Sequence, residues 1–401
     1  MLARRRWLLV LVLACTSASL GGLLLVGKDA LVDDNEGGGP VQGELRREEP
    51  PLPISALGQG KRLLWLSGLQ DKVEGTTKSK YLESSDFYVQ SYLVALLTAR
   101  ENAPSLKPVL ILEGDWQGRE DFLRTVKKLG GVVWFHKLSF EEELRKHKGK
   151  LPQVDNLWGS FLKVDLPLIM DEIAPLIEEN VDKNYILWTD PDVMFEKDLN
   201  SNSLPKPRLF SVAPDAAFDG LPENFGVVYA NVSAYASVFQ QVSHLHFIGF
   251  KVIEHANSRN WHYNIADQAL LNEIFRPTAL ISHLPNTYNY RVYWGRPKPL
   301  FWSPALPPTI IHFHGPKPEF ALCVVNELRA QELLATESKK TLKDEEEGQT
   351  VDEQLLGKCG GRLDILQLVR WGFERDGGEY WDEVVAKYRS YVQRLASKRK
   401  W

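Results

Sequence analysis

The sequence is poor in cysteine, nearly balanced in charge and without an internal repeat. Only three of its 401 residues are cysteines, so the fold does not depend on a disulfide framework, although this number fits a protein of the secretory pathway. The 48 basic and 52 acidic residues give a formal net charge of −4, which argues against a general nucleic-acid-binding protein. The length allows one large domain or two ordinary ones.

Charge is absent from one long segment near the N-terminus. Residues 7–26 contain no charged side chain and follow Arg4, Arg5 and Arg6. A segment of this length can span the hydrocarbon core of a bilayer as a helix, and the arginines are expected on the cytoplasmic side. We therefore predict a single-pass type II protein of the Golgi or ER membrane, with the later residues in the lumen. A cleaved signal peptide is the alternative, because small residues over 14–19 follow a short apolar core.

The segment that follows lacks apolar periodicity. Residues 28–58 are rich in glycine, proline and acidic residues, a composition typical of a flexible stem. We expect a cytoplasmic tail and signal anchor over 1–27, this stem over 28–58, and ordered structure from about residue 59.

Beyond the stem, short apolar stretches alternate with helical patterns. Strand, helix, strand, helix and strand follow one another, which favours parallel pairing through right-handed crossovers. The predicted strands are 63–66, 108–112, 132–135, 185–188, 209–213, 225–230 and 309–313. The predicted helices are 88–97, 122–129, a proline-interrupted segment over 161–179, 267–275, and an amphipathic helix near the C-terminus.

Two carboxylates follow the predicted strand at 185–188. Asp190 and Asp192 flank Pro191, which ends the pairing of the strand and stiffens the turn. In open α/β sheets, ligands bind at the edge formed by the carboxyl ends of the strands. Hard oxygen ligands with open positions suit Mg²⁺ or Mn²⁺ bridging to a substrate phosphate. Taken alone, the same three residues also fit a simple turn after a strand.

Five further motifs accompany this aspartate pair. They are Leu162-Lys163, Ser211-Val-Ala-Pro-Asp215, Asn224-Phe225-Gly226, Ala266-Asp267-Gln268, and Ile311-His312-Phe-His314-Gly315-Pro-Lys317-Pro318. In their order and approximate spacing, the motifs resemble glycosyltransferase family 8, the glycogenin-like retaining enzymes, over roughly residues 61–320. Phe225 stands where the family has a small residue. The last motif is one residue shorter than usual, and Glu319 replaces a tryptophan.

The resemblance implies a GT-A fold, a Rossmann-like mixed and mainly parallel α/β sheet flanked by helices. The catalytic domain would cover residues 59–320, and residues 321–401, which have no counterpart, would form a helical extension. The resemblance also implies a Mn²⁺ or Mg²⁺ ion held by Asp190, Asp192 and His312. His314 is an alternative third ligand, because in a strand it faces the same way as His312. The family spacing to Gly315 favours His312.

A donor site for a nucleotide sugar, most naturally a UDP-sugar, is implied as well. Gly315 would let the backbone approach the diphosphate, and Lys317 would offer it a positive charge. The other donor-binding residues that the resemblance implies are Lys163, Asp215, Asn224 and Gly226. No nucleic acid is expected as a partner.

Retention of the anomeric configuration normally requires a carboxylate nucleophile. The resemblance offers no obvious one, so it implies a front-face reaction in which the departing phosphate oxygen helps to deprotonate the acceptor. Asp267 would then position the acceptor, and Gln268 would stabilise positive charge through its carbonyl oxygen. The expected product is a hexose or pentose on a glycan, glycoprotein or glycolipid.

Two features lie outside these motifs. Asn231-Val-Ser233 is a sequon, usable for glycosylation in the ER lumen. Cys323 and Cys359 are the cysteines beyond the predicted anchor and could form a disulfide, which their spacing cannot establish. Two other functions also stay open: a catalytically silent module that binds sugars or nucleotide sugars, and a hydrolase that cleaves nucleotide sugars with water.

Overall fold

The computed structural model describes residues 61–70, 85–142, 158–214, 223–244, 266–297, 306–338 and 351–398. They all belong to one compact unit, Gly60–Trp401. The predicted anchor and stem lie outside the described residues, and so does Asp215. Within the described ranges, no helix has both the length and the apolar character needed to cross a membrane.

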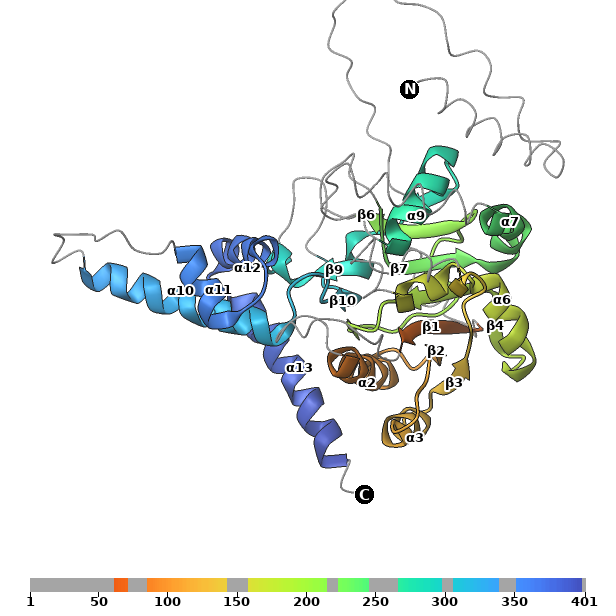
Figure 1. The fold of residues 1–401 in the computed structure, drawn as a ribbon, viewed down its shortest axis with the longest axis horizontal. Coiled ribbons are helices and arrows are strands. Elements are labelled where there is room, and N and C mark those ends of the chain that lie inside the picture. Colours follow the sequence, from red (N-terminus) through yellow and green to blue (C-terminus); the bar gives the residue numbers. More distant parts are fainter. Residues whose placement is uncertain are drawn as a thin grey trace, which may run out of the picture. The chain divides into compact units, whose positions relative to one another are not determined.

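A seven-stranded mixed sheet with the order β3-β2-β1-β4-β7-β6-β8 organises this unit (Figure 1). The first four strands of that order pair in parallel, β7 is antiparallel to both of its neighbours, and β6 pairs in parallel with β8. The strands are β1 (Arg62–Gln70), β2 (Leu106–Glu113), β3 (Val132–Phe135), β4 (Val181–Thr189), β6 (Phe210–Pro214), β7 (Glu223–Asn231) and β8 (Ile281–His283). This confirms the predicted mixed and mainly parallel α/β sheet.

A second, three-stranded sheet begins where β4 ends. Its strands are β5 (Val193–Phe195), β10 (Ile310–His312) and β9 (Tyr290–Arg291), in the order β5-β10-β9. β10 pairs antiparallel with β5 and places His312 opposite Val193. Asp190, Pro191 and Asp192 are therefore the link between the two sheets, next to the end of β10. The sequence predicted β10 but not this sheet, because β5 and β9 are too short to show a period.

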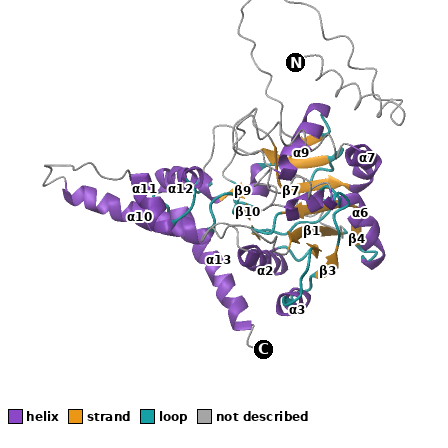
Figure 2. Ribbon diagram, in the orientation of Figure 1, coloured by secondary structure: helices purple, strands orange, loops and turns teal. Residues whose placement is uncertain are grey.

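Both faces of the large sheet are buried against helices (Figure 2). In β1, Leu63 and Trp65 belong to one apolar core, whereas Leu64 and Leu66 belong to the other. The first core includes α2 (Ser85–Asn102) and α3 (Glu120–Lys128), and the second includes α6 (Leu166–Ile173), α7 (Val232–His244) and α9 (Ala266–Phe275). Burial on both faces explains why β1 reads as an apolar run without alternation.

The predicted helix over 161–179 is divided into three pieces. They are η2 (Trp158–Lys163), α6 and η3 (Ala174–Leu176). Pro167 and Pro175 each lie in the first turn of their own helix. Proline is tolerated there because the missing N–H would have no intrahelical partner, so each proline starts a helix where the sequence suggested an interruption. The other short helices are η4 (Arg276–Thr278), η5 (Asn286–Asn289) and η6 (Val292–Trp294).

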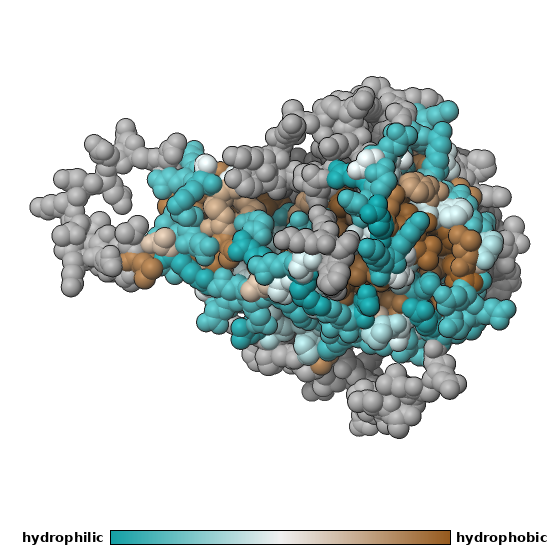
Figure 3. All heavy atoms as spheres, turned by 90° about the horizontal axis from the view of Figure 1, so that it is seen from below, coloured by the Kyte–Doolittle hydropathy of each residue, from teal (hydrophilic) through white to brown (hydrophobic). Residues whose placement is uncertain are grey.

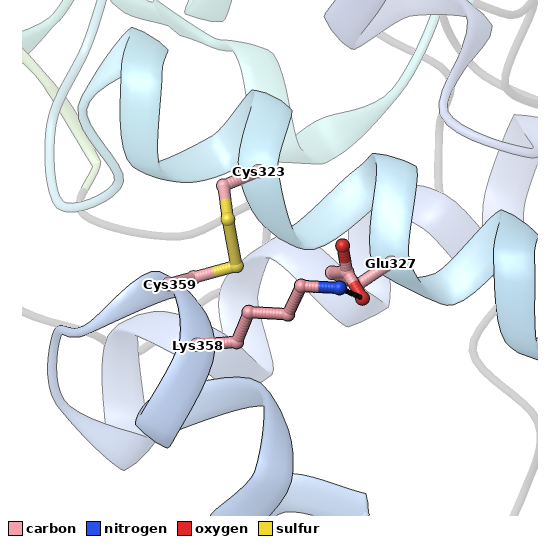
Figure 4. The surroundings of a disulfide bond; sticks show 4 residues. All are labelled: Cys323, Glu327, Lys358 and Cys359. Carbon is pink, nitrogen blue, oxygen red and sulfur yellow. Dashed lines mark hydrogen bonds and ion pairs between the residues drawn. A yellow bond between two sulfur atoms is a disulfide. The ribbon is translucent and has the colours of Figure 1, made fainter.

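Four C-terminal helices complete the unit: α10 (Pro318–Ser338), α11 (Val351–Cys359), α12 (Leu363–Asp376) and α13 (Glu379–Lys398). α13 packs along α2, where the hydroxyls of Tyr388 and Ser91 are 3.2 Å apart. A disulfide joins Cys323 of α10 to Cys359 of α11, with a Cα–Cα distance of 5.7 Å, beside an ion pair between Lys358 and Glu327 (Figure 4). The first of these helices begins at Pro318, and all four belong to the same compact unit as the sheets.

The described surface is mainly hydrophilic on the face shown in Figure 3, with apolar patches between the polar residues. The most exposed large apolar side chains of the described residues come from separate elements, such as Phe135 of β3 and Leu333 of α10. Isolated exposures of this kind are common on globular proteins and indicate no particular partner.

Candidate metal centre and donor site

Three residues of the type that binds divalent cations meet at the junction of the two sheets. One side-chain atom from each of Asp190, Asp192 and His312 lies within 4.8 Å of the others. His312 Nε2 is 3.7 Å from Asp190 Oδ2 and 3.4 Å from Asp192 Oδ1. Two carboxylate oxygens and one imidazole nitrogen form a donor set that Mn²⁺ accepts and that leaves coordination positions open.

Backbone pairing brings these side chains together. Asp190 N donates to Gly226 O at 2.7 Å, which joins the turn to β7. Phe313 N donates to Asp192 O at 2.9 Å, which extends the pairing of β5 with β10 by one residue. The turn between β4 and β5, which carries both aspartates, is therefore held by backbone hydrogen bonds on both sides.

Gly226 shows how closely the site is built. A Cβ atom at this position would lie 2.3 Å from His312 Cε1, 2.8 Å from Asn224 Oδ1 and 2.9 Å from Asp190 Oδ2. Contacts below about 3.0 Å are not tolerated, so only glycine fits while His312 and Asp190 keep these positions. The space beside Gly226 is thus taken up by the side chains of His312, Asn224 and Asp190, two of which are candidate metal ligands.

His312, and not His314, is the histidine beside the aspartates. Its ring is 1% exposed, and its Nδ1 lies 2.8 Å from Asn289 Oδ1. The ring of His314 is centred 5.5 Å from that of His312. Burial, reinforced by Arg291 and His312, holds the pKa of His314 well below its usual value, so this imidazole is neutral. The strand β10 ends at His312, so His314 lies just beyond it, and only His312 belongs to the cluster.

Two lysines pair with the carboxyl groups of the site. Lys163 Nζ is 3.0 Å from Asp190 Oδ1 and 2.9 Å from Asp267 Oδ2, and it donates to Phe225 O at 2.8 Å. Burial disfavours its charged form, but Asp190 and Asp267 outweigh burial and raise the pKa of Lys163 above its usual value. Lys163 is therefore a fixed positive charge between the predicted metal ligand and the predicted acceptor-positioning residue.

Lys317 makes the corresponding contact with the other aspartate. Its Nζ lies 2.6 Å from Asp192 Oδ2 and over the rings of Phe87 and Tyr88. Burial alone would raise the pKa of Asp192, but Lys317 and His312 outweigh burial and hold that pKa far below its usual range. Asp192 is thus ionised at any working pH, as a metal ligand must be.

Asp267 completes the charged part of the site. Burial raises the pKa of Asp267 above its usual value in spite of the nearby Lys163. Three carboxyl groups, those of Asp190, Asp192 and Asp267, share only two lysines among them. The lysines therefore cannot neutralise all three carboxylates, and a bound cation would remove the remaining electrostatic repulsion.

Asn224, a predicted donor-binding residue, and Gln268, a predicted catalytic residue, belong to a buried amide cluster beside the candidate metal site. Asn224 Nδ2 donates to Gln268 Oε1 at 3.0 Å, and Phe225 N donates to the same oxygen at 3.2 Å. Asn289 Nδ2 donates to Asn224 Oδ1 at 2.8 Å. Asn289 was missed by the sequence reading, because a single asparagine in a short turn carries no periodic or spacing signal.

Two of the departures from the family pattern, Phe225 and Glu319, do not disturb the site. The side chain of Phe225 is fully buried in the second apolar core, where its ring packs against Phe210 at 5.9 Å between centroids. Glu319 lies in the first turn of α10 and pairs with Arg389 of α13. Phe225 thus serves packing and Glu319 an ion pair at the surface, and neither removes a charged or amide group from the cluster.

Gly315 and Asn231, two further predicted residues, have other structural surroundings. Gly315 has φ of 80°, a conformation that favours glycine, and a Cβ there would lie 3.1 Å from Leu368 of α12. The C-terminal helices therefore reach the loop between His312 and Lys317. Asn231 Oδ1 accepts hydrogen bonds from Ser233 Oγ at 3.0 Å and Ala234 N at 3.1 Å, so this side chain caps the start of α7.

No protein-family model and no curated protein matches the chain. Solved structures with a distantly similar fold include the glycosyltransferase GlyE of Streptococcus pneumoniae TIGR4, with a TM-score of 0.40, 16% identity, and coverage of 79% of this chain and 65% of that one. Mouse xyloside xylosyltransferase 1 gives a TM-score of 0.35 and 16% identity, covering 63% of this chain and 97% of that one. The bifunctional glycosyltransferase WbbM gives a TM-score of 0.39 and 11% identity, covering 65% of this chain and 47% of that one.

This chain thus spans just under two thirds of the length of GlyE. Similarity of this size does not reveal a donor or an acceptor. These have to follow from the residues of the site.

Proposed function

We propose that this chain is a metal-dependent glycosyltransferase that moves a hexose or pentose from a nucleotide sugar, most naturally a UDP-sugar, to a glycan, protein or lipid acceptor. The observation that carries the proposal is the convergence of Asp190, Asp192 and His312 beside Lys317. A neutral sugar requires neither a cation nor a buried lysine. A diphosphate is stabilised by both, because its negative charge must be balanced as the glycosidic bond breaks.

The ligand residues would hold Mn²⁺ or Mg²⁺, which acts as a Lewis acid on a diphosphate leaving group when it is bound. Lys317 presents a second positive charge next to the same carboxylates, 2.6 Å from Asp192 Oδ2. Lys163 pairs with both Asp190 and Asp267 and so holds the two carboxyl groups in fixed positions. These residues are set before any ligand arrives, which avoids reorganisation during the reaction.

Gln268 has a more restricted role than the sequence suggested. Its Oε1 accepts hydrogen bonds from Asn224 Nδ2 and Phe225 N, and two donors use both lone pairs of a carbonyl oxygen. We propose that Gln268 chiefly holds Asn224 against the donor sugar. Asp267, with its raised pKa, remains the candidate to position the acceptor in a front-face, retaining transfer.

Release of UDP by the purified full-length chain, offered a panel of UDP-sugars with Mn²⁺ and candidate acceptors, tests the proposal. We expect release from one donor, its loss with EDTA, and recovery when Mn²⁺ is added back. Product analysis separates transfer to an acceptor from hydrolysis, and the anomeric coupling of the product in NMR tests retention. A folded chain that binds sugars on an array but releases no UDP from any donor would instead be a catalytically silent binding module.

The membrane assignment rests on sequence alone. We propose residues 7–26 as a signal anchor of the Golgi or ER membrane, with Asn231 in the lumen. The sequon has a structural task as well, because Asn231 Oδ1 caps α7. A shift in electrophoretic mobility after treatment of the cell-expressed chain with an N-glycosidase, absent in Asn231→Gln, would show that the sequon reaches the lumen.

A further inference from the structure

We propose that Asn289 is a positioning residue that fixes His312 as a metal ligand and links it to the donor-sugar side of the site. This inference rests on the metal centre proposed above. Asn289 belongs to η5, lies 23 residues before His312 and is fully buried. None of the sequence motifs includes it.

The first contact of Asn289 decides which nitrogen of His312 is available to a cation. Asn289 Oδ1 lies 2.8 Å from His312 Nδ1, and a carbonyl oxygen can only accept a hydrogen bond. Nδ1 must therefore carry the proton, so the neutral ring has its lone pair on Nε2. Nε2 is the nitrogen that faces the two aspartates, at 3.4 Å from Asp192 Oδ1 and 3.7 Å from Asp190 Oδ2.

The second contact leads away from the aspartates. Asn289 Nδ2 donates to Asn224 Oδ1, and Asn224 Nδ2 donates to Gln268 Oε1. Every donor in this series points in the same direction, from His312 toward Gln268. Turning the amide of Asn289 over would place two oxygens against each other at one end and two donors at the other. The series therefore has one favourable arrangement.

Burial makes this arrangement hard to break. The exposed fractions of His312, Asn289, Asn224 and Gln268 are 1%, 0%, 1% and 7%. A buried amide that loses one partner cannot turn to water instead, so a change at one member disturbs its neighbours. The orientation of the imidazole is thereby coupled to Asn224, and occupancy of the metal position is coupled to the donor-sugar side.

Titration of the purified full-length chain with Mn²⁺ alone, without any nucleotide sugar, tests the first step. Asn289→Ala should weaken Mn²⁺ binding about 10- to 100-fold, the usual effect of removing the partner of a ligating histidine. Free Mn²⁺ can be followed by EPR. Asn286→Ala makes the same substitution in the same short helix, at a less buried position, and should bind Mn²⁺ like the wild type. Wild-type affinity in Asn289→Ala overturns the inference.

Asn289→Asp separates positioning from general damage to the fold. The carboxylate still accepts the proton of His312 Nδ1 but cannot donate to Asn224. Mn²⁺ affinity should therefore lie well above that of the alanine variant, because the contact that orients His312 is kept and only the contact with Asn224 is lost. A folded Asn289→Asp that binds Mn²⁺ poorly contradicts the inference, and this variant decides the matter if Asn289→Ala does not fold.

The coupling to the sugar side is tested with the same probe. Asn224→Ala should weaken Mn²⁺ binding by a smaller factor than Asn289→Ala, and it should have no further effect when Asn289 is already alanine. Effects that simply multiply in the double variant would show that the two sides are independent. A wild-type chain that binds no Mn²⁺ would instead overturn the proposed metal-dependent function, so the two failures are distinguishable.

Discussion

The sheet region and the four C-terminal helices use charge in different ways. In the sheet region two lysines are buried, and both pair with carboxylates of the candidate site, Lys163 with Asp190 and Lys317 with Asp192. In the C-terminal helices the charged residues pair near the surface, as Arg394 does with Glu101. Removing one member of a buried pair is costly, whereas exposed pairs contribute little.

The two regions also differ in what stabilises them. The sheet region is stabilised by apolar cores on both faces of the sheet. The helices α10 and α11 are joined by the disulfide between Cys323 and Cys359. The helix α13 packs against the first core through Trp381 and Tyr388. We therefore expect substitutions in the sheet region to change metal binding and activity, and substitutions in the C-terminal helices to change stability.

The largest effect is expected from Asp192→Asn. This change removes a carboxylate ligand and leaves the ammonium of Lys317 without its partner at 2.6 Å. Metal-dependent turnover should fall at least about 100-fold, because a metal ion supplies several kcal/mol of transition-state stabilisation. The measurement is UDP release at saturating Mn²⁺.

Asp182→Asn is the matched control for that change. Asp182 lies at the start of the same strand, β4, and its Oδ1 accepts hydrogen bonds from the backbone of Asn184 and Tyr185, which an asparagine oxygen can also accept. Turnover like that of the wild type is expected. Equal losses in the two variants would mean that β4 is sensitive to any change of charge, and that Asp192 has no special role.

The disulfide should give the largest effect on stability alone. Cys323→Ser combined with Cys359→Ser opens a link between residues 36 apart, and chain-entropy reasoning puts its contribution at about 3–4 kcal/mol. We expect this loss in the free energy of unfolding by denaturant titration, with Mn²⁺ affinity unchanged below the new transition. A large drop in Mn²⁺ affinity of the folded variant would show that the two regions are not separable in this way.

Much of the sheet region could be predicted from the sequence, and much of the amide cluster could not. The strands near Leu63, Val109 and Ile186 have strong apolar runs. The Asp-Pro-Asp turn could be predicted because it is a local pattern that directly follows one of these runs. Asn289 is different, because its role depends on contacts with Asn224 and His312, which are 65 and 23 residues away. Long-range hydrogen bonds of single polar residues leave no periodic trace in a sequence.

The same reasoning applies to the C-terminal helices. The apolar spacing of Trp381, Val384 and Tyr388 predicted the buried face of α13, and all three side chains are buried. The surface against which that face packs, α2, could not be predicted, because an amphipathic pattern specifies a buried side and no partner. The disulfide was also undecidable from spacing, since it depends on how α10 and α11 meet.

Two glycine substitutions compare the regions more finely. Gly226→Ala places a Cβ 2.3 Å from His312 Cε1 and should cost about 1–3 kcal/mol, the usual range for overpacking, with a matching loss of Mn²⁺ affinity. Gly357→Ala in α11 meets no atom within 4 Å and should stabilise the protein by about 0.5–1 kcal/mol. Denaturant titration and Mn²⁺ binding of both variants check this. The free energy of unfolding should fall in Gly226→Ala and rise in Gly357→Ala. A change of the same sign in both variants would contradict the expected difference between the two regions.

The smallest expected effect is on the pH dependence of stability, and it comes from His136, outside the candidate site. His136 is buried, with Nε2 3.1 Å from Asp165 Oδ2 and Nδ1 3.0 Å from Glu172 Oε2. Burial would lower the pKa of His136, but its hydrogen bonds to Asp165 and Glu172 outweigh burial and raise that pKa above its usual value. His136 directly follows β3, and Asp165 lies two residues after Lys163, the last residue of η2. The hydrogen bond between them therefore connects β3 to the segment that carries Lys163.

A raised pKa in the folded state means that protonation of His136 stabilises the fold. The contribution is fully present below about pH 6.5, the usual pKa of histidine, and is lost as pH rises through the higher pKa of the folded state. The stability difference between wild type and His136→Gln should therefore shrink from pH 6 to pH 8. Glu172→Gln removes one of the two carboxylates, so it should lower the pKa of His136 and move this loss to lower pH. A difference that is constant with pH would mean that His136 is neutral in the fold and serves only as a hydrogen-bonding spacer between β3 and α6.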